Sequence, residues 1–437
     1  MRTIGLDIGT TTLSAVVLEM PTRRLLASRT QKSVGFLTSV NPWEKLQDAE
    51  EIRRRATAMV RELMEQYGPI TAVGLTGQMH GVLYVDEKGV AVSPLYTWQD
   101  ERGNLPVPGG ESFARVMSRK TGYSLATGYG MVTHAWNTAR GIVPPGAKRV
   151  TTIDAYVGMG LTGRQTPILH HSEAASLGVF SQETGCFDLE ALARMGISPE
   201  ILPEVTGKTA FMGIMPSGTL VTVGLGDNQA SFLGSVPDAK RCVLVNMGTG
   251  GQISALAKRP VPSPDMEVRP FVDGDYLLVG SPLCSGRAYA LLEKFIRECA
   301  KMAGAQVDSV YDQMNALAGV QYAHPLKVRT TFSGKRSDPS LRGAIENLGE
   351  ENFTPGHFAR GVLEGMTEEM FDLYQVMKPH LDPQADRLVA SGNAVRLNPV
   401  LRDVLAQRFG MPVSMPDTRE EAACGAAVFA EMACKHR

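Results

Sequence analysis

The segment GLDIGTTT, residues 5–12, decides the fold prediction for this chain. An apolar run from Thr3 to Leu6 leads to one carboxylate, Asp7. The chain then bends through a glycine and three threonines into a second apolar run, Ser14 to Leu18. This pattern predicts two strands joined by a tight turn. Such a turn can hold a phosphate on backbone N–H groups while the acid faces a metal ion. An ordinary hairpin with polar turn residues explains the same letters, so the turn alone leaves both interpretations open.

The same pattern recurs in the second half of the chain. In RCVLVNMGTGGQISALA, residues 241–257, an apolar run precedes Asn246, a Gly-Thr-Gly-Gly turn and a returning strand. The stretch Asp7 to Thr10 aligns with the stretch Asn246 to Thr249. The repeat indicates a duplicated domain in which each half offers a phosphate turn to a shared cleft. Chance similarity of two glycine-threonine hairpins stays as the alternative.

The composition is typical of a soluble globular protein, with 437 residues, 43% hydrophobic residues, 20% charged residues and a net charge of -1. This length predicts two or three domains at roughly 100–200 residues each. The near-neutral charge gives no basic footprint for nucleic acid. Six scattered cysteines without a CxxC pair favour a reducing compartment. Because Asp7 interrupts the first apolar stretch and no uncharged run reaches membrane-spanning length, we expect a cytoplasmic protein without membrane partners.

Strands and helices alternate in both halves, which predicts α/β architecture. We expect helices over residues 49–66, 288–303, 357–376 and 420–435. The stretch that ends at residue 223 is rich in turns and short strands. We therefore place the boundary there, with an N-terminal domain of residues 1–223 and a C-terminal domain of residues 224–437.

Common nucleotide motifs fail on inspection. Gly207-Lys208-Thr209 lacks the first glycine of a P-loop, because residue 202 is leucine. GMGLTG, residues 158–163, fits G-x-G-x-x-G, but Pro167 prevents the helix that a dinucleotide site requires after the last glycine. We expect a helix over residues 153–161 that ends in this glycine turn. The nearby Glu173 region has no metal-ligand spacing, and we interpret it as surface or structural.

Two motifs in the first half suit a polyhydroxylated substrate. TGQMHG, residues 76–81, follows a buried strand, and Gln78 and His80 can both donate and accept hydrogen bonds. TWQDERG, residues 97–103, adds the aromatic face of Trp98 and the carboxylate of Asp100. The alternatives are a structural histidine and a polar loop with an internal Asp100–Arg102 pair.

A third motif, GLGDNQAS at residues 224–231, presents Asp227 after two glycines that end a strand. Asp227 is either a helix N-cap or a general base that takes the proton of an attacking hydroxyl. We favour the base, because the second phosphate turn follows within one strand. Near the end of the chain, VASGNAVRLNP and EEAACGAAVFAEMA could form a flat slot for a purine, or the second could be a tightly packed terminal helix.

Taken in order, DIGTTT, GQMHG, TWQDERG, GLGDNQA, NMGTGG, FSGKR and SGN…EAACGAA resemble the FGGY carbohydrate kinases of the actin/hexokinase/Hsp70 superfamily over nearly the whole chain. The resemblance implies two actin-like (ribonuclease H-like) α/β domains around a central cleft. It further implies ATP and Mg²⁺ as cofactors, a ketose as the small-molecule substrate, and a possible homodimer.

Within the family, TGYG, TIDAY and EAASLGVF resemble the sedoheptulokinase branch, which implies phosphorylation of sedoheptulose at its terminal C7 hydroxyl. A xylulokinase or another pentulose or polyol kinase is the first alternative, since GQMHG occurs there too. A remoter alternative is an actin-like nucleotide-dependent interaction protein without sugar kinase activity.

The resemblance also implies roles for individual residues. Asp7 would position Mg²⁺, and Asp227 would be the catalytic base. The ketose site would include Gln78, Met79, His80 and Asn228. The ATP phosphates and adenine would contact Gly9, Thr10, Thr11, Thr12, Gly248, Thr249, Gly250, Gly392 and Asn393. Two positions depart from the family pattern: Gly250 replaces a hydroxyl residue, and Lys335 stands where an acid is common.

Overall fold

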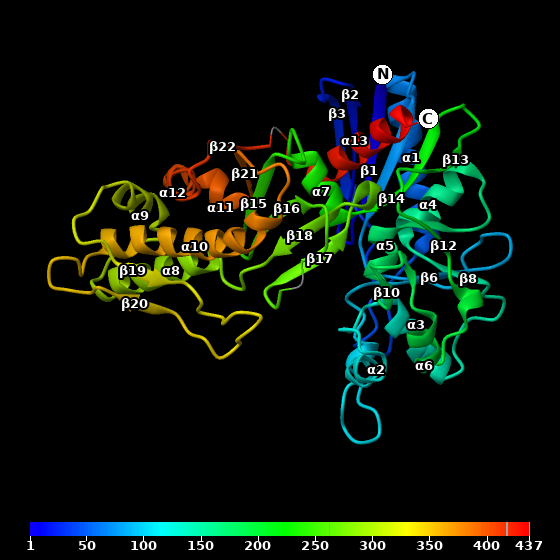
Figure 1. Cartoon of the computed structure of the whole chain (residues 1–437), viewed down its shortest axis with the longest axis horizontal. Coiled ribbons are helices and arrows are strands. Elements are labelled where there is room, and N and C mark those ends of the chain that lie inside the picture. Colours follow the sequence, from blue (N-terminus) through cyan, green and yellow to red (C-terminus); the bar gives the residue numbers. More distant parts are fainter. Residues whose placement is uncertain (262, 417, 437) are drawn as a thin grey trace. The chain divides into compact units, whose positions relative to one another are not determined.

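The computed structural model describes residues 1–261, 263–416 and 418–436. Its contacts divide the chain into two compact units. Unit 1 contains Met1–Gly234, Pro270–Gly274 and Thr418–Arg437, and unit 2 contains Ser235–Arg269 and Asp275–Asp417. Each unit has its own six-stranded sheet with helices packed around it (Figure 1).

The sheet of unit 1 has the strand order β13-β14-β5-β1-β2-β3. Its strands are β1 (Arg2–Ile8), β2 (Thr12–Glu19), β3 (Arg24–Lys32), β5 (Ala72–Gly77), β13 (Phe211–Ile214) and β14 (Leu220–Gly226). β1, β2 and β3 form an antiparallel meander, whereas β5 is parallel to both β1 and β14. The hairpin predicted around GLDIGTTT is therefore confirmed.

The sheet of unit 2 has the order β17-β18-β16-β15-β21-β22. Its strands are β15 (Cys242–Met247), β16 (Gly251–Ala257), β17 (Met266–Pro270), β18 (Tyr276–Gly280), β21 (Arg387–Ser391) and β22 (Val413–Ser414). β18, β16 and β15 are antiparallel, and β21 and β22 continue the sheet in parallel. This arrangement repeats the order β3-β2-β1-β5-β14 of unit 1, so the predicted duplication is confirmed.

The helices agree with the expected ranges to within two residues at each end. Those of unit 1 are α1 (Ala49–Tyr67), α2 (Phe113–Thr121), α3 (Gly130–Ala139), α4 (Ile153–Thr162), α5 (His171–Ser176), α6 (Leu189–Arg194), α7 (Asp227–Ser235) and α13 (Glu421–Lys435). Those of unit 2 are α8 (Gly286–Met302), α9 (Tyr311–Ala318), α10 (Pro355–Met377), α11 (Asn393–Leu397) and α12 (Pro399–Phe409). Among the described residues, no helix combines the length and apolar composition needed to cross a membrane.

Short strand pairs and single helical turns connect these elements. The pairs are β4 (Leu46–Gln47) with β7 (Leu95–Tyr96), β6 (Leu83–Val85) with β8 (Arg149–Thr151), β9 (Ile168–His170) with β12 (Glu204–Thr206), β10 (Phe180–Ser181) with β11 (Cys186–Phe187), and β19 (Lys327–Arg329) with β20 (Ala344–Glu346). The turns are η1 (Arg102–Asn104), η2 (Pro199–Ile201), η3 (Val272–Gly274) and η4 (Lys378–His380).

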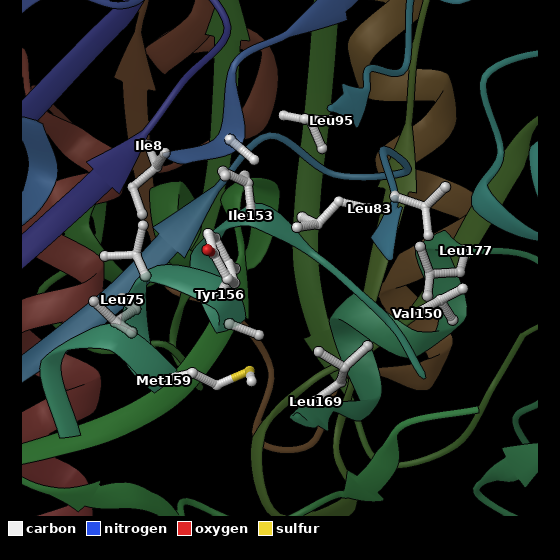
Figure 2. Packing of buried hydrophobic residues seen from close by; sticks show 14 of the residues in the cluster. Ile8, Leu75, Leu83, Leu95, Val150, Ile153, Tyr156, Met159, Leu169 and Leu177 are labelled. Atoms are coloured by element: carbon white, nitrogen blue, oxygen red, sulfur yellow. The ribbon is translucent and has the colours of Figure 1, made fainter. Parts of the chain in front are cut away.

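The core of unit 1 lies between the sheet and α4. Figure 2 shows Ile8 of β1 and Leu75 of β5 beside Tyr156 of α4. Ile8 and Leu75 are fully buried, as are most of the aliphatic side chains around them. Burying one such side chain stabilises a fold by about 1.5–3 kcal/mol. This packing anchors the strands close to the ends from which the predicted functional residues emerge.

The C-terminal helix α13 packs backbone to backbone against the other side of this sheet. A Cβ on Gly5 of β1 would lie 1.8 Å from the carbonyl oxygen of Ala423, and one on Gly74 of β5 would lie 1.8 Å from that of Ala426. Only glycine permits such a close approach. The small residues of α13 allow the helix to lie directly beside β1 (Figure 1).

The packing of α13 corrects the predicted domain division. We expected residues 224–437 to form one domain, whereas Asp227 and α13 both belong to unit 1. The alanines of EEAACGAA are therefore explained by packing on the sheet of unit 1, which was one of the two interpretations left open. The SGN turn of the proposed purine slot lies in unit 2.

This contact predicts the effect of a single methyl group. We expect Gly74→Ala to lower the free energy of unfolding by about 1–3 kcal/mol, because the added Cβ must displace the backbone of α13. Urea unfolding followed by circular dichroism measures the change. Gly35→Ala is the matched control, since its Cβ would meet no atom within 4 Å. Equal stability of the two variants would contradict this account of the packing.

Candidate active site

The site in unit 1 is built on the ends of three neighbouring parallel strands. β5 lies between β1 and β14, and Thr76 is in register with Asp7 on one side and with Leu225 on the other. Asp7, the Gln78 loop and Asp227 consequently leave the sheet at the same edge. The carboxyl ends of parallel strands are where α/β proteins bind ligands. The structure thus brings together residues that the sequence places more than 200 positions apart.

The two acids at this edge influence each other. Burial, followed by the negative charges of Asp227 and Glu420, raises the pKa of Asp7 to about 7. A divalent cation near Asp7 would offset this repulsion and favour the ionised carboxylate. No group of three or more His, Cys, Asp or Glu side chains forms a ready-made metal site in the described ranges. A site with Asp7 as its carboxylate would fit Mg²⁺, which is commonly held by one or two carboxylates together with waters and substrate phosphates.

The loop after β5 is held in a strained but well-supported conformation. His80 has a φ of 71°, which is uncommon for a residue other than glycine. Its backbone N–H donates to Ser176 Oγ at 3.1 Å, and its Nδ1 lies 2.7 Å from the carbonyl oxygen of Ser176. Its ring also stacks on Tyr129 at a centroid distance of 4.6 Å. These contacts fix the orientation of the predicted sugar residues Gln78 to His80.

The short helix α5 supports the segment that carries Asp227 as well as this loop. The N–H of Gly226, directly before Asp227, donates to Ser172 Oγ at 2.9 Å. Ser172 and Ser176 thus connect one helix to two of the three strand ends. Sequence reasoning missed both serines, because nothing in HSEAASLGVF, residues 171–180, distinguishes a supporting hydroxyl from a surface one.

The remaining predicted residues of unit 1 lie around the same strand ends. Gly9 is partly exposed, Thr11 and Thr12 are exposed at the tip of the first turn, and Asn228 follows Asp227 at the start of α7. The Sδ of Met79 lies 3.1 Å from the position of a Cβ on Gly226, which places the methionine against the end of β14.

Trp98 contacts the first phosphate turn. Its indole N–H donates to Thr10 Oγ1 at 3.0 Å, and the Thr10 hydroxyl donates to Gln78 Oε1 at 3.1 Å. The predicted phosphate turn and the predicted sugar residues are therefore linked by side chains. The buried Gln47 is bonded to both Thr10 and Gln78, and no sequence motif indicated it.

Asp100, which we predicted to contact the sugar, pairs with Arg102 in the protein interior instead. It is fully buried, and its Oδ1 accepts from the Arg102 Nε at 2.6 Å. Its Oδ2 accepts from the backbone N–H of Lys45 at 3.2 Å. The buried Arg102 guanidinium packs against the rings of Trp43 and Tyr96. The Asp100–Arg102 pair left open by the sequence is therefore present, and it holds the loop that carries Trp98.

The second predicted phosphate turn borders a cavity of unit 2. β15 and β21 are parallel and in register at Asn246 and Ser391, so the Gly248 turn and the Gly392 turn emerge side by side. The cavity has a volume of about 560 Å³, within the usual range for small-molecule sites. Its lining includes Gly248, Thr249, Asn393, Ala394, Arg287, Tyr289, Tyr311, Asn315 and Asn398. Of these, the residues of α8 and α9 were missed, because neither helix carries a recognised motif.

Gly392 and Gly250, two glycines of this site, differ in whether the surrounding packing requires a glycine. Gly392 has a φ of 90°, and a Cβ there would lie 2.4 Å from the carbonyl oxygen of Met247. Gly392 is therefore required for β15 and β21 to end side by side. At Gly250 a Cβ would meet nothing within 4 Å. The departure of Gly250 from the family pattern is consequently not imposed by packing.

Behind the strand ends lie two further acids. Glu173 of α5 is fully buried, and neither of its carboxyl oxygens has a hydrogen-bond partner among the described residues. Burial, with the charges of Asp154 and Asp227, raises the pKa of Glu173 well above its ordinary value. Of the two interpretations left open for this region, surface or structural, the burial of Glu173 favours the structural one, since the placement of α5 against β14 encloses it.

The repeated sheet, with a glycine turn at a parallel strand end in each unit, is consistent with the actin-like fold class. Comparison with known proteins agrees with this class. A model of the N-terminal domain of the FGGY family of carbohydrate kinases matches residues 2–238, and a model of its C-terminal domain matches residues 243–434. The chain belongs to the FGGY family of carbohydrate kinases.

Individual relatives cover almost the whole chain. It is 27% identical to the sedoheptulokinase of Homo sapiens, over 98% of this chain and 96% of that protein. It is 25% identical to a xylulose kinase of Streptomyces coelicolor, over 97% of this chain and 86% of that protein. The crystal structure of xylulose kinase from Rhodospirillum rubrum superposes with a TM-score of 0.80 at 23% identity, covering 99% of this chain and 90% of that chain.

Glu173 predicts a pH dependence of stability. Because its pKa is raised in the folded chain, the folded state retains a proton that the unfolded chain releases, and stability falls as pH rises above the ordinary glutamate value. Glu173→Gln removes this dependence. We expect the variant to gain stability over the wild type by up to about 1.4 kcal/mol per pH unit within the affected window.

Urea unfolding at a series of pH values between about 5 and 8 measures the difference between the two proteins. Glu190→Gln is the control, since the Glu190 side chain is 91% exposed. A stability difference between Glu173→Gln and the wild type that does not change with pH would overturn this interpretation of the buried acid.

Proposed function

We propose that this carbohydrate kinase transfers the terminal phosphoryl group of ATP to the terminal hydroxyl of a ketose, with sedoheptulose as substrate and sedoheptulose 7-phosphate as product. The observation that carries the proposal is the meeting of Asp7, the Gln78 loop and Asp227 at one edge of the unit 1 sheet. An acid for the metal, hydrogen-bonding groups for a sugar and a second acid for the proton are the parts that such a transfer needs.

Asp227 would act as the general base. The attacking hydroxyl oxygen forms a bond to the terminal phosphorus, the bond to ADP breaks, and the hydroxyl proton passes to the Asp227 carboxylate. Support comes from the position of Asp227 at the end of β14, where Gly226 is anchored to Ser172 at 2.9 Å. A fixed carboxylate loses little freedom when it accepts the proton.

The sugar would contact Gln78, Met79, His80, Trp98 and Asn228. The half-exposed ring of Trp98 offers an apolar face for the carbon chain, and the loop after β5 offers amide and imidazole groups for hydroxyls. The strained backbone at His80, secured by Ser176, supports a pre-organised site.

The ATP would bind with its adenosine in the cavity of unit 2 and its phosphates on the glycine-threonine turns. The carbonyl oxygen of Gly248 accepts from the N–H of Gly286, which steadies the second turn. Mg²⁺ would be held near Asp7, where it supplies charge neutralisation for the triphosphate. The aromatic pair Tyr289 and Tyr311, with centroids 6.0 Å apart, gives the cavity an apolar wall.

The sugar itself is the finer part of the proposal. The 27% identity to a sedoheptulokinase over 98% of this chain favours sedoheptulose. A pentulose or polyol is the alternative, because xylulose kinases are similar at 25% identity. An actin-like interaction protein without kinase activity is no longer supported, since both matching family models describe carbohydrate kinases.

A coupled assay of ADP release across sedoheptulose, xylulose, ribulose and glycerol tests the substrate. We expect the highest kcat/KM with sedoheptulose, and a higher value for xylulose would favour the alternative. In the same assay Asp227→Asn is expected to reduce kcat by about 100-fold or more, the scale of general-base catalysis. Calorimetry should find sugar binding largely unchanged in this variant, and near-normal turnover would exclude Asp227 as the base.

A further inference from the structure

A closed ring of hydrogen bonds joins the first phosphate turn to the sugar loop through Gln47. The Gln47 Nε2 donates to the carbonyl oxygen of Thr10 at 2.9 Å, and the Thr10 hydroxyl donates to Gln78 Oε1 at 3.1 Å. The Gln78 Nε2 donates back to Gln47 Oε1 at 3.0 Å. Gln47 belongs to neither of the two motifs that it connects.

The direction of every bond in this ring follows from two backbone carbonyls. The Gln47 Nε2 also donates to the carbonyl oxygen of Val34 at 2.7 Å. Carbonyls only accept, so Gln47 must turn its NH₂ toward them and its Oε1 toward Gln78. Gln78 must then present its NH₂ to Gln47 and its Oε1 to Thr10. The Thr10 hydroxyl donates its single proton to Gln78, so its oxygen is left to accept from the indole N–H of Trp98.

Gln47 lies at a position from which its hydrogen bonds can constrain both the first phosphate turn and the loop that carries Trp98. It is 1% exposed, so an unmade bond would leave a polar group without water. Its strand β4 pairs with β7 at Leu95, and β7 leads directly into the Trp98 loop. The hydroxyl of Thr97 in that loop donates to the carbonyl oxygen of Lys45 at 2.7 Å. The segment around Gln47 therefore positions the loop by backbone contacts as well as by the ring.

We propose that Gln47 is a positioning residue that couples sugar binding to the geometry of the first phosphate turn. A sugar seated on Trp98 and Gln78 restrains the two groups that bond to the Thr10 hydroxyl, and the ring carries that restraint into the turn. This inference rests on the proposed function, because it takes Gln78 and Trp98 as sugar contacts.

The test separates coupling from general stability. We expect Gln47→Leu to raise the dissociation constant of the sugar about 10-fold or more, because it removes three hydrogen bonds and leaves buried carbonyls unpaired. Gln47→Glu keeps the size and the acceptor but loses the donors, and we expect a similar loss. Both are measured without ATP by calorimetry and by tryptophan fluorescence, and thermal melting verifies that each variant folds.

A double-mutant cycle with Trp98→Phe distinguishes coupling from a merely structural role of Gln47, because only coupling makes the effect of the Gln47 substitution depend on Trp98. If the ring couples the residues, Gln47→Leu weakens sugar binding by a smaller factor in the Trp98→Phe background than in the wild type. Equal factors in the two backgrounds would overturn the inference. Gln66→Leu, on the exposed face of α1, is the control. Should no sugar of the panel be phosphorylated, the proposed function fails; if one is phosphorylated but the factors are equal, only the coupling fails.

Discussion

The parallel pairing of β5 with β1 on one side and β14 on the other is the constraint on which the site of unit 1 depends. Register at Thr76 fixes Asp7 and Leu225 in the same row of the sheet, so the chain segments that follow must leave at one edge. The alignment is secured from behind by α13, which approaches so closely that Gly5 and Gly74 cannot carry a side chain. The arrangement of these strand ends is therefore a consequence of backbone packing against α13.

The two sheets share a topology but divide the chemistry unequally. At the equivalent strand end, unit 1 carries Asp7 and unit 2 carries Asn246. An acid raises the cost of bringing a triphosphate close unless a cation accompanies it, whereas an amide does not. The second turn carries no acid at this position, and it borders a cavity of about 560 Å³ whose lining includes one basic and one acidic residue, Arg287 and Asp312. Under the proposed function, the metal would therefore be held at the turn of unit 1.

The strand ends were predictable because each motif follows an apolar run. An apolar run that is followed by a glycine predicts where a buried strand ends. Gln47 was not predictable, since its partners are 31 and 37 residues away and its strand has two residues. The burial of Glu173 was not predictable for a similar reason: a glutamate is rarely buried, and only the docking of α5 on β14 encloses it. For Asp100 the sequence left a sugar contact and a pair with Arg102 open, and its burial decides for the pair. Local sequence thus locates the functional groups, but long-range packing decides which of them remain available.

The accumulation of acids in unit 1 sets an electrostatic condition on any phosphate chemistry there. Asp7, Asp154, Glu173 and Asp227 act on one another, and burial adds to the pKa of three of them. Arg102 cannot offset them, because its guanidinium is bound to Asp100 and enclosed by aromatic rings. If all four were ionised, the repulsion would oppose both folding and the approach of a triphosphate. Protonation of the two fully buried acids, Asp154 and Glu173, removes charge where no solvent can screen it. In the proposed reaction, the other two acids would take the separate roles of holding the metal, for Asp7, and accepting the hydroxyl proton, for Asp227.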